Sequence, residues 1–377
     1  MNRVGCIKGL LPLCLLLLLS ACVGGTGVSR SSFDGDTLSV RHSTLLQMVD
    51  CDSFFVAEIK NPWREGVLHR YLLVPSDAAV PQNLPQGTLL RTPLQRTLLF
   101  SSVHVSLFEN LGSFNSIKGV CDVAYMLSPL IKKRVAEGEV VDCGSSRDVD
   151  VERVVALLPD ALFVFPFENG GYGKLEKLKY PIVECAEYME SSPLAAAEWV
   201  RFYGRLLGCA AKADSLFDAV CARYEELSAL VSGCEKHPTV MCELKSGSAW
   251  YVPTGGGTMG QMYRAAGADY LFADNEGGGS VPLSYETVLS RAANADLWLF
   301  KYNSPVDKTR ASLLDDFQGY AHFKPFKEGR VYACNSARKS VFEDSAFRPD
   351  MLLAELIAIF HPSLMEGYDL MYYEKVP

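Results

Sequence analysis

A few polar and aromatic residues fall where predicted strands of this chain end and the next helices begin. His104 has this placement, at the start of a helical stretch. An imidazole there could coordinate an iron or cobalt centre, or it could cap the helix or donate a hydrogen bond, and both interpretations stay open. A carrier of bare zinc or manganese would need several converging histidines and carboxylates, so we predict no metal site made by the protein.

The other candidate binding residues combine aromatic rings with short polar side chains in both halves of the chain. They are Ser102, Tyr125, Glu168, Tyr172 and Tyr188 in the first half, and Trp250, Tyr251 and Ser280 in the second. Aromatic walls with a few polar groups suit a large, partly apolar ligand. Several of these aromatic residues could instead belong to the core.

The sequence lacks the common signatures of enzymes. Glycine runs at residues 255–257 and 277–279 have neither the Lys-Ser/Thr of a phosphate loop nor the spacing of a dinucleotide fingerprint. No nucleophile elbow and no HExxH zinc motif occurs, and the adjacent Asp315 and Asp316 fit a solvated helix end. We therefore predict a binding protein without a cofactor.

The beginning of the chain predicts export. Arg3 and Lys8 precede an apolar run at residues 10–19, which is too short to span a bilayer but suits a signal-peptide core. Residues 19–22, Leu-Ser-Ala-Cys, resemble the lipobox of bacterial lipoproteins. The resemblance implies that Cys22 is lipidated and anchors the protein to a membrane of the cell envelope, in the periplasm or at the cell surface.

Charge and cysteine content limit the partners. The chain has a net charge of −8, and removing residues 1–21 would leave −10, with no basic cluster longer than residues 132–134. A nucleic-acid partner is therefore not expected. Nine scattered cysteines follow Cys22 without a CxxC pair, which leaves one or two disulfides open but predicts no dense disulfide framework. We expect a monomer.

Two successive strand–helix alternations predict an α/β fold with two lobes. The first follows a two-stranded ribbon at residues 54–74, and the second begins near residue 239. Between them, residues 212–232 show helical spacing of apolar side chains over about 30 Å. This long helix would join the lobes, with a ligand cleft at the strand ends of both.

The predicted organisation has five parts. They are a signal peptide (1–21), a lipidated cysteine with a flexible tether (22–50), an N-terminal lobe (51–210), an interlobe helix (211–233) and a C-terminal lobe (234–377).

Seven stretches, in order and spacing, resemble the cobalamin and iron-chelate binding proteins of ABC importers. They are residues 96–102, 151–160 and 181–184 of the first lobe and 250–253, 266–270, 281–286 and 347–350 of the second. The resemblance implies a lipoprotein that captures a siderophore, haem or cobalamin-like corrinoid and delivers it to ABC permease and ATPase subunits. A continuous helix between lobes further implies modest lobe closure.

The same resemblance implies a docking role for two acidic residues, Glu152 and Glu286, which would meet arginines of the permease. Both begin predicted helices, where a carboxylate also stabilises the helix end without any partner. Two other functions stay open: a surface receptor that passes haem or a corrinoid to an outer-membrane transporter, and a tetrapyrrole-handling enzyme.

Overall fold

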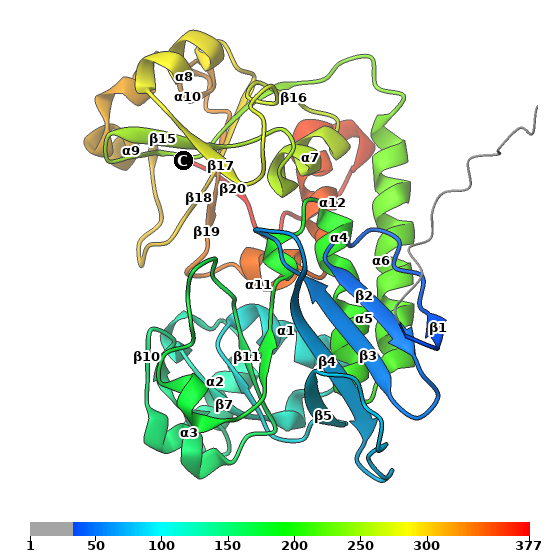
Figure 1. Ribbon diagram of the computed structural model, residues 1–377. Helices are drawn as coiled ribbons and strands as arrows, with labels where there is room; N and C mark the ends of the chain where they lie inside the picture. Colours follow the sequence, from blue (N-terminus) through cyan, green and yellow to red (C-terminus); the bar gives the residue numbers. More distant parts are fainter. Residues whose placement is uncertain (1–32) are drawn as a thin grey trace, which may run out of the picture.

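Two α/β lobes lie at either end of the long helix α6 (Ala210–Val231) (Figure 1). The computed structural model describes residues 33–377, so the predicted signal peptide and Cys22 lie outside the described residues. Across that described range, no helix has the length and apolar character needed to cross a bilayer. Phe217 and Val220 of α6 belong to the first core and Leu227 and Val231 to the second, so the helix bridges the lobes as predicted.

The first lobe contains a parallel sheet covered by helices. Its strand order is β12 (Ile182–Glu184), β11 (Ala161–Val164), β6 (Thr97–Leu99), β7 (Ile117–Val120) and β8 (Val141–Asp142). The helices that alternate with these strands are α1 (Ser102–Leu111), α2 (Pro129–Ala136) and α3 (Val151–Leu157). Short, wholly apolar strands such as β11 are typical of a sheet buried on both faces. The predicted alternation is confirmed.

A five-stranded sheet precedes this lobe. Its strands, in order, are β1 (Asp36–Thr37), β2 (Leu46–Asp50), β3 (Phe55–Lys60), β4 (Val67–Pro75) and β5 (Thr88–Thr92). Strand β2 contradicts the predicted tether at 22–50, because Met48 is fully buried in the first core. The sheet also supports β12 directly, since the Tyr71 hydroxyl donates to the carbonyl of Ile182 and accepts from the backbone N–H of Glu184.

The second lobe has two sheets. The larger one runs β16 (Asp269–Tyr270), β13 (Thr239–Cys242), β18 (Leu297–Tyr302), β19 (Val331–Asn335) and β20 (Glu374–Lys375). The smaller, which the sequence did not predict, is antiparallel and runs β14 (Lys245–Ser246), β15 (Ala249–Pro253) and β17 (Ser280–Leu283). The surrounding helices are α7 (Thr258–Ala265), α8 (Tyr285–Ala292), α9 (Arg310–Asp316), α10 (Lys324–Lys327) and α12 (Pro349–Phe360).

Helices α4 (Pro193–Glu198) and α5 (Val200–Leu206) attach α6 to the first lobe. Asp214 of α6 accepts hydrogen bonds from Arg201 and Arg205 of α5, at 2.9 and 3.1 Å. Although partial burial opposes it, the pairing with both guanidinium groups lowers the pKa of Asp214. The long helix is thus fixed at its N-terminal end by charge as well as by apolar packing.

A second connection between the lobes runs through α11 (Val341–Ser345), which the sequence did not predict. Phe347, just after this helix, is only 2 % exposed and belongs to the first core, although it follows strand β19 of the second lobe. Ser106 and the backbone N–H of Leu127, both in the first lobe, donate to Asp344 and Glu343 of this segment at 3.2 and 2.9 Å. This segment therefore connects the lobes in addition to α6.

Candidate ligand-binding site

A cavity of about 410 Å³ lies between the two lobes, within the size range of ligand pockets. The apolar side chains that line it are Val103, Phe165, Pro193, Ala196, Met259, Met262, Val341, Phe342, Ala346 and Leu352. The polar and charged residues that line it are Glu187, Tyr188, Thr258, Lys301 and Ser345. Residues from both lobes and from α11 therefore form one mainly apolar chamber.

Lys301, at the C-terminal end of β18, places a cation in the wall of this cavity. Its Nζ lies 2.9 Å from Oε1 of Glu243, and both side chains are largely buried. Burial alone would lower the pKa of Lys301, but the carboxylate of Glu243, together with the nearby Tyr373 and Tyr263, more than offsets burial and holds that pKa well above its ordinary value. The ammonium is therefore charged in the folded protein and already has an anionic partner.

The first-lobe wall contains a buried polar cluster behind Glu187, which begins the short helix η4 (Glu187–Met189). The Tyr203 hydroxyl donates to Oε2 of Glu187 at 2.7 Å, and Nε2 of His104 lies 3.0 Å from Oε1. That His104 contact lacks the geometry of a hydrogen bond. The neighbouring thiol of Cys185 has a pKa well above its ordinary value, chiefly because of burial and then because of Glu187.

His104 was expected at the cleft surface, and this expectation is wrong. Its side chain is fully buried among aromatic rings, with ring centroids 5.7 Å away for Phe165 and 5.5 Å for Tyr203. The physical reason is its helix face: His104 shares the buried side of α1 with Phe108 and Leu111. Neither His104 nor Ser102 caps α1. The capping residue is Ser101, whose side chain accepts a hydrogen bond from the backbone N–H of Val103.

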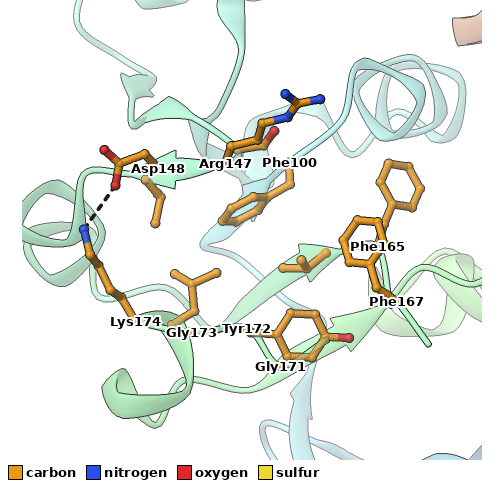
Figure 2. Close-up of a pocket in the computed structure, with 13 residues that line it drawn as sticks. Phe100, Arg147, Asp148, Phe165, Phe167, Gly171, Tyr172, Gly173 and Lys174 are labelled. Atoms are coloured by element: carbon orange, nitrogen blue, oxygen red, sulfur yellow. Dashed lines mark hydrogen bonds and ion pairs between the residues drawn. The ribbon is translucent and has the colours of Figure 1, made fainter. Parts of the chain in front are cut away.

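A further cavity of about 540 Å³ opens in the first lobe (Figure 2). The rings of Phe100, Phe165, Phe167 and Tyr172 surround it, and the ion pair between Lys174 and Asp148 closes its edge at 3.1 Å. Phe165 lines both cavities, so the two spaces adjoin at this ring. Burial raises the pKa of Tyr172, which keeps its phenol neutral.

Two of the predicted binding residues line these cavities, namely Tyr172 in the first lobe and Tyr188 between the lobes. Ser102 lies next to Val103 of the interlobe cavity and hydrogen-bonds to Glu343 of α11.

Four other predicted residues line neither cavity, and a binding role for them stays a prediction. Tyr125 in η2 (Val123–Tyr125) and Glu168 are exposed on the first lobe, and Tyr251 and Ser280 are exposed on the small sheet of the second.

Trp250 was expected at the cleft and is instead a core residue. It is fully buried, and its indole N–H donates to the carbonyl of Cys242 at 2.9 Å. Its ring packs against Trp298 and Phe323 at centroid distances of 5.9 and 5.6 Å. Alternation along β15 is the reason, because Trp250 points inward and Tyr251 outward.

Sequence reasoning missed Lys301 and Phe342. Lys301 had a usable signal, since it follows the apolar run at residues 297–300 at the end of a parallel strand, where ligand sites gather. Phe342 had none, because α11 is too short for helical periodicity to stand out. All nine described cysteines are free thiols, so neither of the disulfides left open by the sequence forms in this part of the chain.

The two predicted docking residues lie on opposite lobes. Glu152 is exposed in the first turn of α3 and Glu286 in the first turn of α8. Figure 1 shows these helices at the far ends of the two lobes, both on the side away from α6. The pKa of Glu286 is lowered by its own backbone N–H and by Ser284, as expected of a carboxylate at a helix start.

Comparisons with known proteins agree with this architecture. A family model described as periplasmic binding protein matches residues 104–337, which leaves the sheet β1–β5 outside the match. Two uncharacterized lipoproteins of Methanocaldococcus jannaschii are each 28 % identical, one over 74 % of this chain and 68 % of its own length, the other over 83 % of both.

Solved structures share the fold. A periplasmic haem-binding protein of Pseudomonas aeruginosa has a TM-score of 0.59 at 18 % identity, covering 75 % of this chain and 98 % of its own. A possible iron-binding periplasmic solute-binding protein of Staphylococcus epidermidis has a TM-score of 0.56 at 17 % identity, covering 71 % and 99 %. A Helicobacter pylori protein, CeuE, has a TM-score of 0.58 at 13 % identity, covering 83 % and 90 %.

Proposed function

The chain belongs to the periplasmic binding protein family, whose members are non-enzymatic solute-binding proteins of the type used in ABC transport. We propose that its solute is a bulky iron chelate, haem or cobalamin-like corrinoid. The observation that carries this proposal is the apolar cavity formed jointly by both lobes, with Lys301 in its wall. Such a chamber can bury a large ligand while the cation orients one anionic group of it.

The character of the walls favours this class of solute over a sugar or an amino acid. Phe165 and Phe342 offer ring surface, and Met259 and Met262 offer soft, adaptable apolar contacts. A small polar solute would need a dense set of hydrogen-bond donors and acceptors, whereas the walls are mainly apolar. The haem-binding and possible iron-binding proteins that share the fold support the same class.

A ligand screen tests the proposal. Purified protein is titrated with haem, cobalamin, cobinamide and several ferric siderophores, and binding is followed by absorbance and calorimetry. We expect saturable one-to-one binding of one member at micromolar affinity or better. Absence of binding by every member would overturn the proposed solute class while leaving the family unaffected.

Two variants tie any observed binding to the interlobe cavity. Phe342→Glu introduces a charge into the apolar wall at a side chain that is 52 % exposed, so folding should be preserved. We expect a loss of at least about tenfold in affinity, the effect of about 1.4 kcal/mol. Val306→Glu, at an exposed position outside the cavity, is the matched control and should bind as the wild type does.

We further propose that Glu152 and Glu286 orient the loaded protein on an ABC permease. Both residues are exposed, and they lie on opposite lobes, which supports a permease surface that contacts the two lobes at the same time. Rim charges of this kind mainly set orientation and association rate. Arginine at both positions should abolish uptake without changing ligand affinity, whereas arginine at the exposed Glu65 and Glu366 should not. Unchanged uptake would favour a receptor that works without a permease.

We also propose that Cys22 carries the lipid anchor, on the basis of its sequence context and the lipoprotein relatives. Cys22→Ala should move the protein from the membrane fraction to the soluble fraction of the envelope. Fractionation with detection of the protein checks this, and an unchanged distribution would contradict a lipidated Cys22.

A further inference from the structure

Three potential metal ligands meet in the first lobe, behind the wall of the interlobe cavity. One donor atom each from His104, Cys185 and Glu187 lie within 4.8 Å of one another. The three side chains are buried, with relative exposures of 0 %, 0 % and 2 %. They come from α1, from the residue after β12 and from η4, so the fold brings them together across more than 80 positions of sequence.

This cluster is poorly satisfied by the protein itself. Neither ring nitrogen of His104 makes a hydrogen bond to any described residue. Glu187 accepts from Tyr203, but no lysine or arginine of the described range forms an ion pair with it. A buried imidazole that makes no hydrogen bond and a buried carboxylate with no lysine or arginine beside it are both costly.

Two other buried carboxylates of the molecule are much better satisfied. Glu198 accepts from the backbone N–H groups of residues 41–43 and from Arg201. Glu355 accepts from the N–H groups of residues 371–373. In both cases the protein supplies three or more donors, whereas Glu187 accepts from one hydroxyl and has the His104 imidazole 3.0 Å away without the geometry of a hydrogen bond.

We propose that His104, Cys185 and Glu187 bind a divalent transition-metal ion of the zinc type. Nitrogen, sulfur and oxygen donors in this combination match the ligand preferences of zinc and of cobalt as its probe. When the ion binds, the Cys185 thiol releases its proton to solvent, and thiolate plus carboxylate then balance the two positive charges. Tyr203 remains hydrogen-bonded to Glu187 and orients it as an outer partner.

The geometry requires only a small adjustment. Ligand atoms around a tetrahedral zinc ion are about 3.3–3.6 Å apart, given bonds of about 2.0–2.3 Å. The Nε2–Oε1 separation of 3.0 Å is close to this, and the other separations, which are at most 4.8 Å, must shrink by up to roughly one ångström. The thiol of Cys185 makes a long hydrogen bond of 3.5 Å to the carbonyl of Val183 and a further one with the Tyr203 hydroxyl, and it gives up the first of them when it turns toward the ion. Glu187 lines the interlobe cavity and offers a route for the ion.

The inference does not depend on the proposed solute. The ligands all belong to the first lobe, so the ion would bind whether or not a chelate or corrinoid occupies the cavity between the lobes. It differs from the sequence prediction of no metal site, because His104 is more than 80 positions away from Cys185 and Glu187 and the three residues match no known ligand spacing.

Cobalt titration tests the site. Purified protein is stripped with a chelator and titrated with Co²⁺ under reducing conditions, and the metal content of the untreated protein is measured in parallel. We expect one equivalent of Co²⁺ with a thiolate-to-metal charge-transfer band and tetrahedral d–d bands, all displaced by Zn²⁺. Zinc should also raise the Tm of the stripped protein.

Matched variants assign the ligands. Cys185→Ala should remove the charge-transfer band and lower affinity by more than the 10–100-fold typical of losing an outer partner. Cys121→Ala, at another fully buried cysteine of the same lobe, should keep the charge-transfer band and the metal affinity of the wild type. Glu187→Gln conserves shape and serves if Cys185→Ala misfolds; it should lose binding and the zinc-dependent rise in Tm. No stoichiometric binding, or binding unaffected by both Cys185→Ala and Glu187→Gln, would overturn the proposal.

Discussion

The two walls of the interlobe cavity each bury a carboxylate, and they handle its charge differently. In the second lobe, Glu243 has its cation in the chain itself, with Nζ of Lys301 at 2.9 Å. In the first lobe, Glu187 has a phenol and a poorly aligned imidazole. A buried charge needs compensation. In the second lobe the buried carboxylate is therefore neutralised by a lysine of the chain itself. In the first lobe no lysine or arginine of the described residues neutralises it, which suits the binding of a cation from outside.

The largest effect should come from breaking the packing around the first-lobe cluster. Phe347 packs against His104 and Tyr203, at centroid distances of 6.3 and 5.8 Å, and is almost fully buried. Phe347→Ala should lower the free energy of unfolding by about 3–5 kcal/mol, from lost burial plus a cavity. Chemical denaturation measures this. Phe342→Ala, at an exposed ring in α11, should lower the free energy of unfolding far less. If Phe347→Ala lowered it no more than Phe342→Ala does, Phe347 would not anchor this segment in the first lobe.

Removing the internal cation of the second lobe should have the next largest effect. Lys301→Met leaves Glu243 without its partner, and loss of one member of a fully buried pair costs about 3–5 kcal/mol. The pair here is slightly exposed, so we expect about 2–3 kcal/mol. The double variant Lys301→Met with Glu243→Gln should recover most of this in denaturation experiments. If it does not, the contribution of Lys301 is packing rather than charge.

Neutralising the first-lobe carboxylate should have a small effect in metal-free protein. Glu187→Gln keeps an acceptor for Tyr203 and removes a charge that no described lysine or arginine balances, so the free energy of unfolding should change by less than about 1 kcal/mol. A loss of 3 kcal/mol or more would show that His104 and Glu187 already form a complete ion pair, and the contrast between the walls would disappear.

A pH effect of still smaller size is expected where the lobes meet. Burial raises the pKa of Glu343, so the folded protein holds its proton more tightly than the unfolded chain does. Its contribution to stability is therefore full below the ordinary carboxyl pKa of about 4.3 and decreases as pH rises through the raised value. The difference in Tm between Glu343→Gln and wild type should become more positive from pH 4 to pH 7, and a constant difference would contradict this assignment.

Much of the fold follows from sequence patterns, and its exceptions have physical causes. The run at residues 161–164 is wholly apolar because β11 is buried on both faces, and α6 has apolar side chains at helical spacing because it packs on two cores. Strand β17 escaped prediction because Pro282 argues against a strand. It is nonetheless an edge strand beside β15, where a proline is tolerated.

The candidate site was harder to predict than the fold, because it depends on which side of an element each residue faces. Trp250 and Tyr251 look equivalent in sequence, yet the pleat of β15 sends one into the core and the other to the surface. The spacing of His104 from Phe108 and Leu111 did indicate a buried face. The joining of His104 to Cys185 and Glu187 depends on tertiary contacts that no local pattern encodes.

Hydrogen–deuterium exchange with the tightest ligand of the screen tests the central claim, that solute binds between the lobes. At saturation, backbone amides of α1 in the first lobe, of α7 in the second lobe and of α11 between them should all exchange more slowly, because residues of each line the cavity. Slowing confined to the first lobe, or slowing of neither wall, would contradict a binding site shared by the two lobes.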